Sequence, residues 1–227
     1  MKKVICNKFD KRLLSDFSVE QFPGRIVVVQ TATDAEKAVD YLLSQPILGV
    51  DTETKPSFQK GVASHLVALL QVATYDTCFL FRLNKMGMTP AIIRLLEDKQ
   101  VLKVGLSWHD DLIGLKKRGE FTPGYFIDLQ DLVSSLGIED LSLQKLYANL
   151  FQKKINKRQQ LTNWEKGVLD DKQKMYAALD AWACIQLYEE MMRLKETGDY
   201  ELIITDNPNE EETTPESDEH VESDEHV

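Results

Sequence analysis

Two acidic residues near the start of this sequence have the spacing of a metal site. Asp51 and Glu53 are separated by one residue at the end of the apolar run 47–50. In an extended strand, both side chains project to the same side of the sheet. Adjacent carboxylates repel unless a cation lies between them, and a hard ion such as Mg²⁺ or Mn²⁺ prefers oxygen ligands. The pair therefore suits metal-assisted phosphodiester hydrolysis, although in isolation it is more typical of a solvated strand end.

A tyrosine and a third acid lie far downstream, one helical turn apart. Tyr176 and Asp180 are four residues apart within the periodic segment 172–194, so a helix places them on the same face. The tyrosine hydroxyl could orient a water molecule and help to deprotonate it, while Asp180 completes the metal site. Alone, the pair is also typical of a structural hydrogen bond at the border of the core.

A fourth acid, Asp111, follows the apolar run 101–104 at the entry to a predicted helix. An acid in this place is also typical of a first helical turn, where the helix dipole favours negative charge. Asp110 is an adjacent alternative. We favour Asp111 because Asp111-Leu112 begins the apolar periodicity of the helix.

The elements that position these residues are strands in the first half of the chain and helices in the second. Apolar runs predict strands over 26–29, 47–51, 66–73, 78–83 and 101–104, with a hairpin turn at Tyr75-Asp76. Polar residues at 31–34 and the pair Thr89-Pro90 predict the starts of helices over 34–44 and 90–96. Further helices are predicted over 112–117, 128–136, 142–150 and 172–194. The pattern predicts a mixed α/β domain with an antiparallel meander that begins at Asp51.

Composition limits the classes of protein to which the chain can belong. Its 227 residues are 43% hydrophobic, which is enough for one domain with a sizeable core. The three cysteines lie far apart and suggest neither a disulfide framework nor a cysteine zinc site, so a reduced, cytoplasmic setting is expected. We also expect a soluble, unexported protein without a membrane partner, because no apolar stretch has the length of a membrane span.

The negative charge of the chain is concentrated at its carboxyl end. The formal net charge is -10, but residues 206–227 contain ten acids and no Lys or Arg, which leaves 27 acids against 27 bases in the body. Segment 206–227 is therefore predicted to be a disordered acidic tail, which offers a possible site for a protein partner. Its His220 and His226 could bind a stray divalent ion. A net negative charge argues against a nucleic-acid partner, because phosphates repel it. This argument does not apply to the body of the chain, which is neutral.

Together, the acids and the tyrosine resemble the motifs of the tyrosine-bearing (DEDDy) branch of the DEDD 3'-5' exonucleases. This group includes ribonuclease D and the exonuclease domain of the Werner syndrome helicase. Similarity to the Werner-type domain extends to Asn163-Trp164-Glu165 and Leu141-Ser142-Leu143, and the resemblance covers about residues 24–195. The three motifs occur in the family's order: Asp51-Thr52-Glu53, then Lys103-Val104 with Asp111-Leu112 eight residues after the lysine, then Tyr176 to Ala181.

The resemblance implies an α/β, ribonuclease H-like fold with a mixed central sheet flanked by helices, and a cleft with two Mg²⁺ or Mn²⁺ ions. By analogy, Asp51, Glu53 and Asp180 would hold the ion that carries the attacking water. Asp51 would bridge to a second ion, which Asp111 would reach directly or through water, and Tyr176 would position the nucleophile. The resemblance also divides the chain into an N-terminal extension (1–23), the exonuclease domain (24–205) and the acidic tail (206–227).

Several basic and aromatic residues could hold a nucleic-acid strand. The densest basic stretch lies shortly before the third motif, and a second group follows the first motif, where a base and an aromatic side chain could steer a single strand. Trp108 could stack on a base, or it could anchor the strand-to-helix turn as a buried residue. A histidine beside the acids, His109, is interpreted as an incidental surface residue. The candidates are Lys55, Phe58, Lys60, Trp108, Lys153, Lys154, Lys157 and Arg158.

The expected activity is removal of nucleoside 5'-monophosphates from single-stranded or recessed 3' ends, with DNA favoured over RNA. The alternatives are an exoribonuclease that trims RNA and a binding module without catalysis. Only 47 residues follow Asp180, so no helical domain of the ribonuclease D type follows the nuclease core in this sequence. Processivity is therefore expected to come from the nuclease body or from a partner. The sequence leaves the oligomeric state open.

Overall fold

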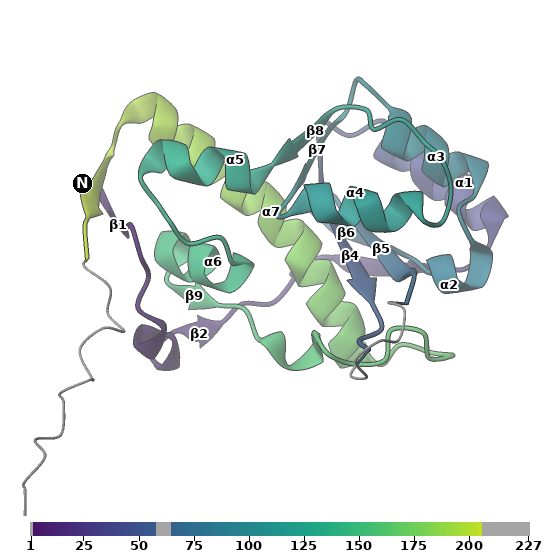
Figure 1. Ribbon diagram of the computed structural model, residues 1–227, viewed down its shortest axis with the longest axis horizontal. Helices are drawn as coiled ribbons and strands as arrows, with labels where there is room; N and C mark the ends of the chain where they lie inside the picture. Colours follow the sequence, from purple (N-terminus) through teal and green to yellow (C-terminus); the bar gives the residue numbers. More distant parts are fainter. Residues whose placement is uncertain (1, 58–64, 206–227) are drawn as a thin grey trace, which may run out of the picture.

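A six-stranded mixed sheet organises the chain. The computed structural model describes residues 2–57 and 65–205 (Figure 1). The sheet has the order β3-β6-β5-β4-β7-β8; β5 is antiparallel to both of its neighbours, and the remaining pairs are parallel. The meander β4-β5-β6 thus lies within the sheet, as the sequence predicts. Its strands are β3 (Arg25–Val29), β4 (Ile47–Thr54), β5 (Val67–Ala73), β6 (Thr77–Phe81), β7 (Leu102–Gly105) and β8 (Phe126–Asp128).

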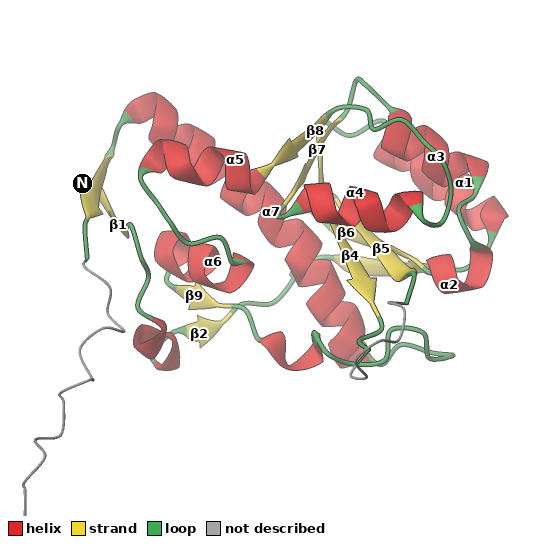
Figure 2. Cartoon of the chain, viewed as in Figure 1, coloured by secondary structure: helices red, strands yellow, loops and turns green. Residues whose placement is uncertain are grey.

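Helices cover both faces of this sheet. The long helix α7 crosses one face, where its core also includes α5 and α6, whereas α1, α3 and α4 share the core of the other face (Figures 1 and 2). This arrangement confirms the predicted α/β class with a central mixed sheet flanked by helices. The helices are α1 (Ala32–Leu42), α2 (Leu83–Met86), α3 (Pro90–Glu97), α4 (Trp108–Lys116), α5 (Leu129–Val133), α6 (Leu143–Phe151) and α7 (Asp171–Thr197), with 3₁₀ turns η1 (Lys11–Ser15), η2 (Ser134–Leu136) and η3 (Lys157–Gln159).

Local capping signals explain where most helices begin. Thr31 accepts a hydrogen bond from the backbone of Asp34, and Thr89 accepts one from Ile92 ahead of α3. Helix α4 differs from its prediction, because it begins at Trp108 rather than at residue 112. Asp111 therefore lies within its first turn. The cap of α4 comes from a residue far along the chain, so no local signal marks its start.

The two ends of the described chain meet on the body of the protein. Strand β1 (Lys3–Cys6) pairs in parallel with β10 (Tyr200–Ile203), and β2 (Ser18–Val19) pairs with β9 (Lys153–Lys154). These short strands carry no predicted pattern. Side chains of the first 23 residues, among them Ile5 and Phe22, are buried in the core on the α7 side. Within the described part of the chain, no helix has the length and apolarity needed to cross a membrane.

Candidate active site

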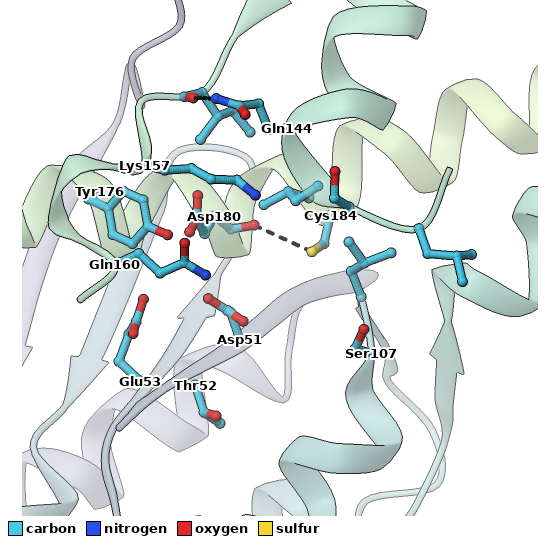
Figure 3. Close-up of a pocket in the computed structure, with 15 residues that line it drawn as sticks. Asp51, Thr52, Glu53, Ser107, Gln144, Lys157, Gln160, Tyr176, Asp180 and Cys184 are labelled. Carbon is cyan, nitrogen blue, oxygen red and sulfur yellow. Dashed lines mark hydrogen bonds between the residues drawn. The ribbon is translucent and has the colours of Figure 1, made fainter. Parts of the chain in front are cut away.

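Three of the predicted acidic side chains come together between β4 and α7. Asp51 and Glu53 leave β4 on the face that α7 covers, and Asp180 approaches them from α7 (Figure 3). Each contributes a carboxylate oxygen to a group whose members all lie within 4.8 Å of one another. As the sequence predicts, alternation along β4 places Asp51 and Glu53 on the same face of the sheet, and Asp180 lies on a helix that faces them.

Close packing of α7 on β4 brings Asp180 to the strand. The backbone of Gly49 lies so near to α7 that a Cβ atom there would be 1.9 Å from the carbonyl oxygen of Ala181. The helix presents small side chains in this region, and Ala177 and Ala181 are fully buried. Glycine on the strand and alanine on the helix therefore set the distance between the two elements that carry the acids.

Substituting alanine for Gly49 should push α7 away from β4. We expect the free energy of unfolding to fall by about 1–3 kcal/mol, as for other overpacked sites, and catalytic turnover to fall about tenfold or more as Asp180 moves. The matched control is Gly167→Ala, since a Cβ atom at Gly167 meets nothing within 4 Å. Urea unfolding and a nuclease assay measure both effects. Equal stability and activity of the two variants would contradict this role for Gly49.

The electrostatics of the group favour a bound cation. Burial, followed by the charges of Asp111 and Asp180, raises the pKa of Asp51 well above its usual range. Burial and the neighbouring acids raise the pKa of Glu53 to about 10, and burial raises that of Asp180 to about 7. Among the described residues, Oδ1 of Asp180 is buried and has no hydrogen-bond partner. These oxygens fit a divalent ion, which would stabilise the charged forms and satisfy that atom.

Tyr176 lies beside the carboxylates and is kept in its protonated form. Its side chain is 8% exposed, and its ring lies 6.1 Å from that of Trp164. Burial and the charges of Asp180 and Glu53 raise the pKa of the phenol far above its usual value. The residue therefore presents a neutral hydroxyl, which can donate a hydrogen bond, next to the acidic group.

Asp111 occupies a different position from the other three acids. It extends from α4, in the opposite layer, and its carboxylate accepts a hydrogen bond from the hydroxyl of Thr52. Thr52 points away from Asp51 and Glu53 in Figure 3, as alternation along β4 requires. Asp111 is therefore near enough to raise the pKa of Asp51 but stands outside the group of three.

The acidic group opens into a cavity of about 270 Å³. Lys157 and Gln160 enter it from the segment around η3; in Figure 3, Lys157 lies above Asp180, and Gln160 lies between Asp180 and the pair on β4. The sequence does not predict Gln144, near the start of α6, or Gln160, directly after η3, because no motif marks either residue. Cys184 could have been predicted, because it lies one helical turn after Asp180 on α7. The remaining lining residues are the apolar Leu106, Leu141, Leu143 and Ile155, the polar Thr52, Ser107 and Ser142, and the acidic group with Tyr176.

Comparison with known proteins settles the family. The model of the family described as 3'-5' exonuclease matches residues 26–196. The chain belongs to the 3'-5' exonuclease family. This match confirms the resemblance that the three motifs indicate, and the acidic group agrees with the divalent-metal dependence of the family.

Relatives of this exonuclease include larger proteins. The mouse bifunctional 3'-5' exonuclease/ATP-dependent helicase WRN is 27% identical over 187 residues, which cover 78% of this chain and 13% of that protein. A 3'-5' exonuclease of Arabidopsis thaliana is 30% identical over 189 residues, which cover 77% of this chain and 66% of the relative. The exonuclease chain thus spans less than two thirds of the length of either relative.

Solved structures share the fold of this exonuclease. The EXO domain of Aedes aegypti Nibbler superposes with a TM-score of 0.68 at 22% identity, covering 77% of this chain and 90% of that one. Trypanosoma brucei RNase D, in a complex with RNA U12, superposes with a TM-score of 0.65 at 19% identity, covering 75% and 63% of the two chains. These neighbours confirm the predicted ribonuclease H-like fold.

The four residues of the basic stretch of the exonuclease lie in different surroundings; they are Lys153, Lys154, Lys157 and Arg158. Lys157 alone of the four lines the cavity that holds the acids. The ammonium of Lys153 lies 2.7 Å from Glu20, and that of Lys154 donates to the backbone oxygens of residues 14 and 15. Arg158 lines a neighbouring cavity of about 390 Å³ that shares Tyr176 with the first.

Of the other predicted strand contacts, the one at Trp108 is wrong. Lys55 directly follows β4, outside the residues that line the cavity, and forms an ion pair with Glu165 at 3.7 Å. Phe58 and Lys60 lie outside the described residues. Trp108 is 1% exposed and its ring stacks on Phe126 at 5.3 Å, so it cannot stack on a base. The alternative interpretation, a buried anchor of the strand-to-helix turn, is the one that its packing supports.

Proposed function

We propose that the protein removes nucleoside 5'-monophosphates one at a time from the 3' end of a nucleic-acid strand, by a two-metal mechanism. One observation carries the proposal: Asp51, Glu53 and Asp180 converge within 4.8 Å in a cavity that Tyr176 also lines. Three carboxylates are the expected ligands of Mg²⁺ or Mn²⁺, and paired ions about 4 Å apart are typical of nucleases. Family membership supports the direction of cleavage.

The four acids and Tyr176 each have a defined part in this proposal. Asp51, Glu53 and Asp180 would hold one ion, and Asp51 with Asp111 would hold the second, Asp111 directly or through water. When bound, such ions polarise the phosphate and lower the pKa of a water molecule. Tyr176 donates its hydroxyl hydrogen bond beside the attacked phosphorus and so orients the incoming oxygen.

Other residues that line the cavity supply contacts for the terminal nucleotide. Leu106, Leu141 and Leu143 offer an apolar surface for a base, without hydrogen bonds that would select one base. Lys157 brings positive charge to the same cavity, where it lowers the pKa of Asp180 and can approach a phosphate oxygen. Sequence-independent trimming is the behaviour that these contacts favour.

We propose single-stranded or recessed DNA as the substrate, with RNA as the second candidate. The resemblance of Leu141-Ser142-Leu143 and Asn163-Trp164-Glu165 to the Werner-type domain favours DNA. The shared fold with T. brucei RNase D in complex with RNA U12 favours RNA. Single-stranded DNA, 3'-recessed DNA and RNA of the same sequence, digested side by side with Mg²⁺ or Mn²⁺, discriminate between them. We expect the DNA strands to be shortened faster than the RNA. Faster shortening of the RNA would favour RNA as the substrate. Binding without cleavage would mean that the protein is a binding module without catalysis.

Removing the hydroxyl of Tyr176 should slow the reaction without weakening ion binding. We expect Tyr176→Phe to lower kcat by about 10²-fold, the usual contribution of a group that positions or moves a proton. The Mn²⁺ concentration for half-maximal activity should stay within about twofold of wild type, because no carboxylate is altered. Tyr188→Phe, on the same helix α7, is the matched control. Wild-type turnover in Tyr176→Phe would rule out this role for the hydroxyl.

A further inference from the structure

The turn between β7 and α4 has a backbone conformation that needs outside support. Ser107, the N-cap of α4, has φ 57° and ψ 32°, in the left-handed region that residues other than glycine rarely adopt. Within the described part of the chain, its side chain forms no capping hydrogen bond with the helix. The first N–H groups of α4 therefore require an acceptor from elsewhere.

Asp128, at the end of β8, supplies that acceptor. Its Oδ1 accepts hydrogen bonds from the backbone of Ser107 and of Gln130, each at 3.0 Å. Its Oδ2 accepts one from the backbone of His109 at 3.3 Å and lies 3.0 Å from Nδ1 of the same histidine. The residue is only 5% exposed. One buried carboxylate thus caps both α4 and α5, which pack on opposite faces of the sheet.

Gln130 extends this support to the wall of the active-site cavity. Its Nε2 donates to the hydroxyl of Ser107 at 2.5 Å and to the backbone oxygen of Leu141 at 3.4 Å. Ser107 and Leu141 both line the cavity that holds the acids. The side chains of Asp128 and Gln130 therefore tie together two segments, distant in sequence, that shape the place of the terminal nucleotide.

The same contacts determine where Asp111 lies. Asp111 belongs to the first turn of α4, two residues after His109, which Asp128 holds. At its other side, its carboxylate accepts the hydrogen bond from Thr52 on β4. The first turn of α4 is thus fixed between β8 and β4. A shift of about 1 Å at a reacting group can cost roughly 10²-fold in rate, so the position of this turn affects catalysis.

We propose that Asp128 is a positioning residue of the nuclease, which acts through Asp111 and through the cavity wall without touching the substrate. The inference rests on the proposed function, because it concerns the same site. Gln130 assists by holding the wall, and loss of either side chain leaves the three converging carboxylates in place.

The variant Asp128→Asn tests this inference with little change of shape. The amide replaces one acceptor oxygen with a donor, which faces the N–H groups of either Ser107 or His109. We expect kcat to fall about 30- to 100-fold and the Mn²⁺ concentration for half-maximal activity to rise severalfold. The KM for a single strand should change less than about threefold, because the variant removes no substrate contact.

A double-mutant cycle separates positioning from a merely structural role. Because Asp128 acts partly through Asp111, the loss caused by Asp128→Asn should be severalfold smaller in the Asp111→Asn background than in wild type under single-turnover conditions. An equal loss in both backgrounds would overturn the inference. The control is Thr89→Ala, which removes the cap of α3 away from the cavity and should keep kcat within about twofold of wild type.

Amide hydrogen exchange provides a readout that does not depend on activity. Residues 106–112 should exchange faster in Asp128→Asn than in wild type, and unchanged exchange would overturn the inference. If wild type is active and Asp128→Asn is equally active, the inference about Asp128 is contradicted and the proposed function is not. An inactive wild type contradicts the proposed function instead, and the exchange experiment still decides whether Asp128 holds the turn.

Discussion

Replacing Asp180 with asparagine is expected to reduce release of nucleoside monophosphates by about 10³-fold or more, while leaving the fold intact. The substitution keeps the shape of the side chain but removes a negative charge from the three-carboxylate group, and losses of this size follow the removal of a principal electrostatic group. Stability should not suffer, because Asp180 is a buried acid among like charges. Without divalent ions at pH 8, we expect the variant to melt a few degrees above wild type.

The matched control for this variant lies on the same helix. Asp171, in the first turn of α7, has a side chain that is 97% exposed and pairs with Lys174. We expect Asp171→Asn to keep wild-type activity and to melt within about 1 °C of wild type, as is usual for a surface change. The two variants are compared by single-turnover digestion of a labelled strand and by thermal melting in EDTA. Activity in Asp180→Asn comparable to that of Asp171→Asn would refute the assigned role.

Chelation of divalent ions is expected to abolish activity and to destabilise the protein increasingly as pH rises. The folded state raises the pKa of Asp180 to about 7, whereas an unfolded aspartate titrates near 3.9. Folding therefore takes up a proton between these values, so the stability from this group is complete below about pH 4 and is lost as pH rises through about 7. Glu53, with its pKa raised to about 10, extends the loss to higher pH.

A bound cation should reverse this trend, because it stabilises the charged carboxylates. We expect Mn²⁺ to raise the Tm little at pH 5 and by several degrees at pH 8, where a change of 1 kcal/mol corresponds to about 2–4 °C for a chain of this size. Thermal melting in EDTA and in Mn²⁺ at both pH values gives the comparison. In Asp180→Asn, the gain at pH 8 should shrink. An equal gain at both pH values in wild type would mean that the ion does not bind these carboxylates.

Much of the site follows from local periodicity. The two-residue spacing of Asp51 and Glu53 predicts a shared face of β4, and the four-residue spacing of Tyr176 and Asp180 predicts a shared face of α7. Both relations depend only on the geometry of one strand or one helix. The convergence of the two elements depends on their close packing at Gly49, which no single segment of sequence reveals.

Other features could not be predicted because distant residues determine them. Helix α4 begins before its apolar periodicity because Asp128 caps it from another strand, and this places Asp111 in a first helical turn. Lys153 and Lys157 are four residues apart, yet Glu20 engages the first while the second enters the cavity. A tryptophan such as Trp108 can lie at the surface or in the core. Here it is buried because its ring stacks on that of Phe126, which lies on β8.

The central claim is that three converging carboxylates hold the ions with which the protein removes nucleotides from a 3' end. The most direct test is digestion of a 5'-labelled single strand by wild type and Asp180→Asn, with Mn²⁺ or with EDTA. We predict a ladder that shortens from the 3' end one nucleotide at a time, with nucleoside 5'-monophosphate as product, only for wild type with Mn²⁺. Shortening that persists in EDTA or in Asp180→Asn, or an intact strand under all conditions, would contradict the claim.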